Sequence, residues 1–406
     1  MIPPWLLLFL TFSPSGYSSA PTSEPTVELI ESWPRGTNLD HADLRDASVV
    51  WLEAFDAAKT SIDLAQFYLS EEPGAGPAST LGAIVSAIER AAARGVKVRG
   101  LFDAKFYKTY PETIDRLGHA KSVETRLLDL KPVTGGVLHA KYFVVDGQVT
   151  YLGSQNMDWR SLEHIQELGV LVDSKPVAAT FLEAFELDWR IAGGDKRTEQ
   201  GSKAADGFPL RVGAGSEEFR ITPVYSPLEL APDPRLWDLP RLVSLIDGAK
   251  QSVRVQLLTY RMTGRDGTYF EELENALRRA AARGVKVQLL LADWCMRKGT
   301  IEGLQALEPL ANVEVKLVTI PQSGEGFVPF ARVIHAKYLA VDGRAAWVGT
   351  SNWEKDYFHE SRNVGVVIEG GPLPRRLDQF FLDGWNGPYA KPVDPCATYV
   401  APRIGE

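Results

Sequence analysis

The sequence contains few cysteines and no surplus of basic residues. Its 406 residues include only Cys295 and Cys396, which excludes a disulfide-dense scaffold and a cysteine-rich zinc module. The two thiols could form one disulfide in an oxidising compartment or stay unpaired. Lys and Arg total 44 against 52 Asp and Glu, which leaves a net charge of −8. A chain with this net charge lacks the excess of basic residues that a protein needs to bind nucleic acid over an extended surface. Any anion-binding site therefore has to be local.

Long apolar stretches are also missing. A membrane-spanning helix needs about 20 apolar residues, and the stretch from Trp5 to Phe12 is much shorter. Small polar residues ending in Ser18, Ser19 and Ala20 follow it, which is typical of a secretory signal, although no Lys or Arg precedes the stretch. We therefore interpret residues 1–20 as a signal peptide. The mature chain is then exported, to the cell exterior, the periplasm or the lumen of an organelle.

The rest of the chain has ordinary globular composition and carries an internal repeat. The octapeptide Ala91 to Val98 recurs letter for letter as Ala280 to Val287. In each copy a helical pattern ends at a glycine, and an apolar segment typical of a strand follows. Helices that alternate with strands predict the α/β class, with sheets covered by helices. We expect two similar lobes, residues 26–195 and 217–400, joined by a surface linker over residues 196–216.

A second duplicated element carries chemical groups. The pattern His-x-Lys-x4-Asp occurs once in each half, ends in the turn signal Asp-Gly, and is followed by Gly-Ser-x-Asn or Gly-Thr-x-Asn. His and Lys two residues apart on a strand share one face of the sheet. Two matches at equivalent repeat positions are a specific signal. The candidate site residues are His139, Lys141, Asp146, Ser154 and Asn156 in the first half and His335, Lys337, Asp342, Thr350 and Asn352 in the second.

A pseudo-symmetric set of imidazoles, amines, hydroxyls and amides suits a phosphoryl group. Neutral imidazole can attack phosphorus while a protonated imidazole on the opposite face donates to the departing oxygen. Lysines and amides would hold the nonbridging oxygens. A zinc site on the two histidines is the competing use, but the neighbouring lysines would repel a cation. Asp146 and Asp342 precede glycine, so they also fit a purely structural role in turns.

These motifs resemble those of the phospholipase D superfamily, whose signature is the duplicated His-x-Lys-x4-Asp element with the following Gly-Ser-x-Asn segment. Four segments are similar to the endolysosomal, exonuclease-type branch: Val27 to Ser32, Gly153 to Leu162, Glu167 to Val170 and Gly349 to Trp353. The resemblance covers nearly all of the chain after the leader. It implies two pseudo-symmetric α/β/α sandwich lobes that share one active site at their interface, a covalent phosphohistidine, and no metal or other cofactor.

The resemblance also implies a carboxylate behind one catalytic imidazole. Glu167 lies 28 residues after His139, where similar family members hold the imidazole Nδ1–H. Asn363 has the equivalent position after His335, and Glu360 could replace it there. Because a carboxylate fixes the tautomer and stabilises positive charge, we expect His139 to be the nucleophile and His335 the general acid. The reverse assignment stays open, since the same carboxylate raises the pKa of a histidine.

The sequence therefore predicts an exported, metal-independent phosphodiesterase that cuts single-stranded nucleic acid from its 5′ end. Hydrolysis of phospholipid headgroups, or transfer to an alcohol, uses the same chemistry and stays the alternative. A homologue that binds without catalysis is a third interpretation, which the intact motifs disfavour. The expected partner is a phosphodiester substrate, no transmembrane span is expected, and a homodimer is kept open.

Overall fold

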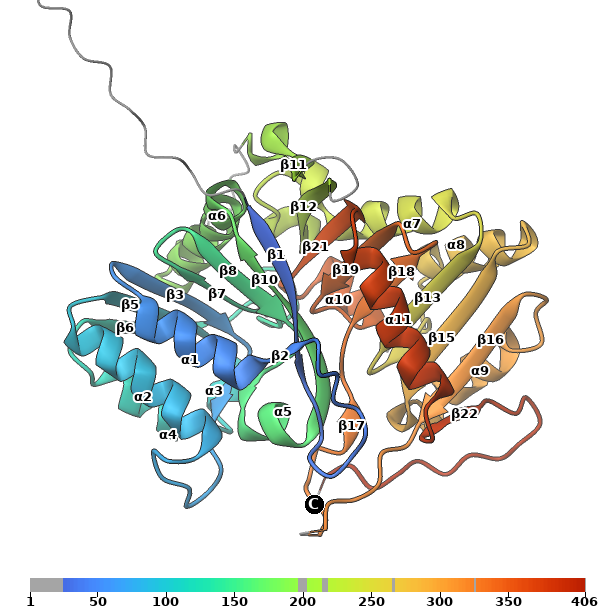
Figure 1. The fold of residues 1–406 in the computed structure, drawn as a ribbon, viewed down its shortest axis with the longest axis horizontal. Helices are drawn as coiled ribbons and strands as arrows, with labels where there is room; N and C mark the ends of the chain where they lie inside the picture. The colour runs from blue at the N-terminus through green and yellow to red at the C-terminus, as the bar shows by residue number, and fades with distance from the viewer. Residues whose placement is uncertain (1–24, 196–202, 214–217, 265–266, 325, 406) are drawn as a thin grey trace, which may run out of the picture.

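The computed structural model describes residues 25–195, 203–213, 218–264, 267–324 and 326–405. The expected signal peptide lies outside the described residues. Each half of the sequence forms one large mixed sheet with helices packed on it, and the two sheets lie side by side (Figure 1). The predicted α/β class and two-lobed architecture are thereby confirmed. Within the described ranges, every helix is too short or too polar to cross a bilayer.

The first lobe has the strand order β2-β1-β10-β8-β7-β3-β5-β6. Its strands are β1 (Thr26–Ser32), β2 (Arg45–Asp46), β3 (Ser61–Gln66), β5 (Lys97–Asp103), β6 (Val123–Leu128), β7 (Lys141–Val145), β8 (Val149–Gly153) and β10 (Ile165–Asp173), with a separate short pair, β4 (Leu69–Ser70) and β9 (Met157–Asp158). Its helices are α1 (Ala47–Ala57), α2 (Thr80–Ala93), α3 (Ala104–Tyr107), α4 (Glu112–Gly118), α5 (Trp159–Glu163) and α6 (Lys175–Ala192).

The second lobe has the order β11-β12-β21-β19-β18-β13-β15-β16-β22. Its strands are β11 (Leu210–Val212), β12 (Phe219–Ser226), β13 (Ser252–Leu257), β15 (Lys286–Ala292), β16 (Val313–Val318), β18 (Tyr338–Val341), β19 (Ala345–Gly349), β21 (Asn363–Gly370) and β22 (Ala390–Pro392), with a short pair, β14 (Tyr260–Arg261) and β20 (Trp353–Glu354). Its helices are α7 (Asp238–Gly248), α8 (Glu272–Ala282), α9 (Ile301–Leu307), α10 (Lys355–His359) and α11 (Leu373–Asn386), with 3-10 turns η1 (Ala204–Gly207), η3 (Leu228–Leu230), η4 (Pro234–Leu236) and η5 (Asp293–Met296).

The sequence repeat becomes a repeat of strand order. The run β1-β10-β8-β7-β3-β5-β6 in the first sheet corresponds to β12-β21-β19-β18-β13-β15-β16 in the second. The register corresponds as well, because Ser61 pairs with Lys97 in one lobe and Ser252 with Lys286 in the other. The repeated octapeptide therefore ends one helix and begins the next parallel strand in both lobes.

The expected linker contains part of the second lobe. Strand β11, at residues 210–212, pairs antiparallel with β12 and forms the edge of the second sheet. The linker prediction over residues 196–216 was therefore too long at its carboxyl end. Leu210 and Val212 pack against the central core, so burial of apolar side chains draws this segment onto the sheet.

Apolar packing joins the lobes. Helices α1 and α2 cover the outer face of the first sheet, and α7 and α8 cover that of the second. A third core lies between the lobes and includes side chains from α6, β12 and α11. Phe181 of α6 contacts Tyr142 at 5.2 Å between ring centroids and Tyr225 of the second lobe at 5.5 Å. The two lobes therefore form one packed unit.

Candidate active site

Each motif histidine is bonded through its backbone to the opposite lobe. The N–H of His139 donates to the carbonyl of Arg362 at 2.9 Å, and the N–H of His335 donates to the carbonyl of Gln166 at 2.8 Å. A short strand before His335, β17 (Val333–Ile334), also pairs parallel with the start of β10. The segment that carries His139 and the segment that carries His335 thus each reach across to the opposite lobe. This crossing brings the two histidines together.

The crossing decides which side chain lies behind each imidazole. Nδ1 of His335 lies 2.7 Å from Oε2 of Glu167, and Nδ1 of His139 lies 3.0 Å from Oδ1 of Asn363. The expectation that Glu167 holds His139 was wrong, because β10 delivers Glu167 next to the segment bonded to Gln166. The alternative of Glu360 as partner of His335 was also wrong, since Glu360 lies beside Gly135 and accepts a bond from Thr134 through its carbonyl.

The amide of Asn363 has one defined orientation. Its Nδ2 donates to the carbonyls of Tyr357 at 2.8 Å and Ser361 at 3.2 Å. Oδ1 therefore faces His139 and accepts the Nδ1–H of its imidazole. This fixes the tautomer of His139, so that Nε2 of the neutral ring carries a lone pair.

The two motif lysines are buried beside the histidines. Lys141 and Lys337 have no exposed surface, and His139 and His335 are 6% and 9% exposed. Nζ of Lys141 donates to the carbonyl of His139 at 2.6 Å, and Nζ of Lys337 donates to that of His335 at 2.5 Å. One donor of each ammonium is thus committed, and two remain for an anion.

Burial and mutual repulsion shift the pKa values of this cluster. Burial, then the charges of Lys141 and Lys337, hold the pKa of His139 well below its usual value. Burial also lowers the pKa of His335, but less strongly because Glu167 opposes the shift. The pKa of Lys337 falls to about 7 through burial. These shared charge effects show that the four groups lie within one small region.

Glu167 keeps its negative charge in this region. Burial alone would raise the pKa of its carboxyl group, but the charge and hydrogen bond of His335 hold that pKa below its usual value. Ser154 adds a further hydrogen bond that acts in the same direction. The pair Glu167–His335 is therefore suited to a protonated imidazole, and the pair Asn363–His139 to a neutral one.

The motif hydroxyls, which were expected to bind substrate, lie behind these partners. Thr350 donates to Oδ1 of Asn363 at 2.9 Å and accepts the N–H of Val364 at 3.1 Å. Ser154 accepts the N–H of Leu168 at 3.0 Å, next to Glu167. Both hydroxyl side chains are fully buried, and each fixes the strand that carries the partner of a histidine.

The two motif asparagines differ in their surroundings. Asn156 is 7% exposed and its Oδ1 has no hydrogen-bond partner. Asn352 donates to the Tyr357 hydroxyl at 3.2 Å and lines a cavity. Both side chains stay candidates for contacts with the nonbridging oxygens of a substrate.

Asp146 and Asp342 lie at the far ends of their strands from the histidines, and their assignment to the site was wrong. Asp146 accepts the backbone N–H groups of Thr60 at 2.7 Å and Ser61 at 3.0 Å. Asp342 binds the backbone N–H groups of residues 250–252 in the same way. Each Asp-Gly pair has positive φ at both residues, the geometry of a tight hairpin turn. The structural role considered for these residues is the one observed.

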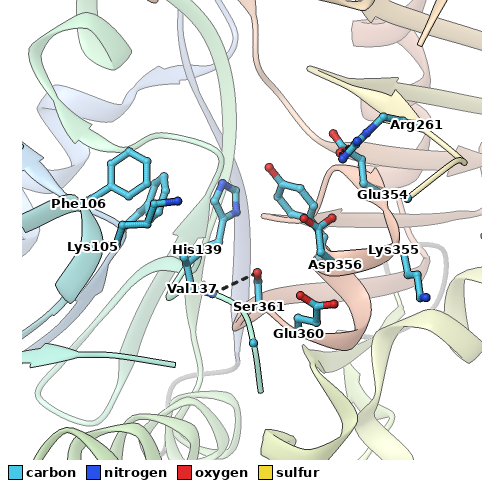
Figure 2. Close-up of a pocket in the computed structure, with 15 residues that line it drawn as sticks. Lys105, Phe106, Val137, His139, Arg261, Glu354, Lys355, Asp356, Glu360 and Ser361 are labelled. Atoms are coloured by element: carbon cyan, nitrogen blue, oxygen red, sulfur yellow. Dashed lines mark hydrogen bonds and ion pairs between the residues drawn. The ribbon is translucent and has the colours of Figure 1, made fainter. Parts of the chain in front are cut away.

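His139 opens into a cavity of about 490 Å³ between the lobes. Figure 2 shows Lys105 and Phe106 of the first lobe on one side of the imidazole, and Asp356 and Glu360 of the second on the other. Phe67 meets the His139 ring at 4.9 Å, and Tyr357 meets it edge-on at 4.8 Å. The nucleophile candidate therefore lies in an opening with aromatic walls and charges of both signs.

Comparison with known proteins decides the family. A family model described as "Cardiolipin synthase, PLD-like domain" matches residues 51–189 and 242–385, one segment in each lobe. The chain belongs to the phospholipase D-like family. Its relatives include "Phospholipase D Z" of Dictyostelium discoideum, 31% identical over 91% of both chains, and "5'-3' exonuclease PLD3" of Macaca fascicularis, 30% identical over 94% of this chain and 84% of the relative. "5'-3' exonuclease PLD4" of Mus musculus is 31% identical over 85% and 74%.

Solved structures support the phospholipase D-like fold. Phosphatidylserine synthase of Haemophilus influenzae superimposes with a TM-score of 0.58 over 85% of both chains, at 13% identity. Together, the family match and the relatives place the chain in the phospholipase D superfamily and identify it as a phosphodiesterase.

Several residues that shape this phospholipase D-like site lie outside the sequence motifs. Asp103 accepts the N–H of Leu138 at 2.9 Å and so anchors the segment before His139. Arg362, which accepts from His139, forms a fully buried ion pair with Asp188 at 2.6 Å. Asp103 ends the repeated strand β5, and side chains at the carboxyl ends of parallel strands commonly form sites. That position was the available signal for it, whereas no local pattern marks Asp188.

Cys295 and Cys396 are free thiols, the first buried and the second exposed. The composition allowed either one disulfide or two unpaired thiols, and the structure has the unpaired thiols.

Proposed function

We propose that this phosphodiesterase works without a metal through a covalent phosphohistidine, and that its substrate is single-stranded nucleic acid taken from the 5′ end. One observation carries the catalytic part: the four basic side chains His139, Lys141, His335 and Lys337 are buried close enough to shift one another's pKa values, and Glu167 is bonded to His335. A bound anion would offset the repulsion between these four groups and raise the lowered pKa values of the histidines and lysines, so the cluster favours an anionic ligand.

In the first step, Nε2 of His139 attacks phosphorus and the bond from phosphorus to the leaving oxygen breaks. His335, protonated and paired with Glu167, transfers its Nε2 proton to that oxygen. The free donors of Lys141 and Lys337 bind the nonbridging oxygens, where negative charge has to be held in place.

In the second step, water attacks the phosphorus of the phosphohistidine and the P–N bond breaks. The now neutral His335 accepts a proton from this water, which returns it to its starting state. The Nδ1–H of His139 stays on Asn363 throughout, so His139 leaves as a neutral ring.

The cavity wall supports nucleic acid as the substrate class. Phe67 and Phe106 contact each other at 3.9 Å and both line the cavity beside His139. Aromatic rings next to a phosphate site suit the stacking of bases, which contributes about 1–3 kcal/mol per base. The two mammalian relatives carry exonuclease names, whereas the Dictyostelium discoideum relative is named a phospholipase.

Export is also part of this proposal. It rests on the apolar leader of residues 1–20 in the sequence. A homodimer stays a prediction.

The function is tested with a panel of substrates at pH 5 and pH 7.5 in the presence of a chelator. Wild type and His139→Ala are assayed on 5′- and 3′-labelled single-stranded oligonucleotides, on duplexes, on phosphatidylcholine vesicles and on bis(4-nitrophenyl) phosphate. We expect chelator-resistant release of single nucleotides from the 5′ end by wild type only. Turnover of the vesicles alone would make the substrate assignment wrong, and activity lost to the chelator would make the metal-free mechanism wrong.

A further inference from the structure

A second cavity, of about 550 Å³, adjoins the one that contains His139. Its wall includes Trp294, Arg297 and Lys298, which the proposed chemistry does not use. The two cavities are neighbours, because they share the lining residues Arg261, Gly264, Glu354, Asp356 and Tyr357.

The position of this cavity follows from the repeat. Trp294 comes directly after β15, just as Lys105 and Phe106 come directly after β5. Strands β15 and β5 are equivalent in the two sheets. Each lobe therefore presents an aromatic ring and cations at the carboxyl end of the same strand, on either side of the shared centre.

The charges of the second cavity favour an anion at its outer part. Arg261 is paired with Glu354 at 2.9 Å, so these two charges offset each other. Arg297 and Lys298 are exposed, and within the described part of the chain neither forms an ion pair with a carboxylate. Asp356 is the remaining carboxylate on the wall, and it leaves an excess of positive charge near Arg297 and Lys298.

Trp294 supplies a surface for a flat ligand. Its side chain is half-buried and packs against the core between the lobes, and the Arg297 guanidinium lies 5.9 Å from its ring centroid. An anchored ring beside two cations has the components of a single-strand binding surface, in which a base stacks and a backbone phosphate is neutralised.

We propose that the second cavity is a nucleotide subsite. The base next to the scissile phosphodiester stacks on Trp294, and the following phosphate binds Arg297 and Lys298. This inference rests on the proposed function, because it names where a single strand lies beyond the reacting phosphate. It requires affinity to rise when the substrate gains one nucleotide beyond the scissile bond.

The test compares wild type with Trp294→Ala, Trp294→Tyr and the double variant Arg297→Ala/Lys298→Ala, with Lys391→Ala as an exposed control outside both cavities. Substrates are a dinucleotide, a ten-residue single-stranded oligonucleotide and bis(4-nitrophenyl) phosphate. For the oligonucleotide we expect KM to rise about 5- to 160-fold in Trp294→Ala, as the loss of one stacked base implies, with recovery in Trp294→Tyr. The double variant should lower the slope of log kcat/KM against log salt by about 0.7 per lost phosphate contact.

Turnover of bis(4-nitrophenyl) phosphate should be unchanged in every variant, which also shows that each variant folds. Equal KM values for the oligonucleotide in wild type and variants would overturn the subsite while leaving the nuclease assignment intact. If wild type cleaves bis(4-nitrophenyl) phosphate but no oligonucleotide, the proposed substrate fails and the subsite fails with it.

Discussion

The carboxylate of Glu167, on a strand of the first lobe, lies 2.7 Å from Nδ1 of His335 in the second lobe. The matching position behind His139 holds the neutral amide of Asn363, from the second lobe. The two otherwise similar halves thus differ at the one place where a charge decides which imidazole is protonated. This exchange of partners supports the proposed assignment of His139 as nucleophile and His335 as acid. The sequence had suggested the same assignment for the opposite reason, with the carboxylate behind His139.

The first prediction concerns pH. Burial lowers the pKa of both histidines, and lowers that of His139 more strongly. A neutral His139 and a protonated His335 therefore coexist only below about pH 6.5, and kcat/KM of wild type should peak there. Glu167→Gln removes the group that raises the pKa of His335, so the alkaline limb of the profile should move down by about one pH unit or more. Movement of the acid limb instead would make His335 the nucleophile.

Asn363→Asp is the complementary variant, because it places a carboxylate behind His139 instead of removing the one behind His335. A carboxylate behind His139 should raise its pKa, so the neutral form is lost as the pH falls through this higher value. The acid limb should move up by about one unit or more, with the alkaline limb unchanged. Both profiles are measured as kcat/KM from pH 4 to 8 on a single-stranded oligonucleotide, because its alkoxide leaving group needs the proton of a general acid.

The second prediction separates the two steps. 4-Nitrophenolate departs as a stable anion and needs little help from an acid, so His335→Ala should still form the phosphohistidine. It should release about one equivalent of nitrophenol per site in a burst and then stall, because no base activates water. His139→Ala should give no burst. A labelled phosphoryl group found on His335 in wild type would contradict the assignment.

The third prediction concerns the buried pair Asp188–Arg362, which joins α6 of the first lobe to the segment that binds His139. Asp188→Ala leaves the guanidinium buried and unpaired, so the free energy of unfolding should fall by about 3–5 kcal/mol. The double variant Asp188→Leu/Arg362→Met should recover most of that stability. Denaturant unfolding measures both, and equal loss in the single and double variants would exclude a charge effect.

The fourth prediction concerns Asp146, whose backbone contacts hold the start of β3. Burial opposes its ionisation, but hydrogen bonds from Ser61 and Thr60 lower its pKa. The stabilisation is therefore complete above the unfolded-state pKa near 4 and is lost as the pH falls below it. Asp146→Ala should cost about 1.5–3 kcal/mol of unfolding free energy at pH 7, with kcat within about twofold of wild type. A collapse of kcat in a folded Asp146→Ala would return this residue to the chemistry.

The sequence by itself determined the two lobes and the place of each histidine within its lobe. The octapeptide repeat, the alternation of helix and strand, and the Asp-Gly turns are local patterns, and local patterns specify helix ends, strand faces and hairpins. Equivalent strands in the two lobes therefore carry equivalent motif residues, as the pairing of Ile62 with Val145 and of Val253 with Val341 shows, since each of these valines directly precedes a motif aspartate.

Only the tertiary structure decided which partner each histidine receives. His335 and Glu167 are 168 residues apart, and His139 and Asn363 are 224 apart. Both contacts depend on the crossing of two segments between the lobes, which no spacing within one lobe encodes. The same holds for Ser154 and Thr350, whose hydroxyls turn to the neighbouring strand because buried polar groups must find hydrogen-bond partners. The sequence therefore specifies which side chains are present, and the packing of the two lobes determines that His335 pairs with Glu167 and His139 with Asn363.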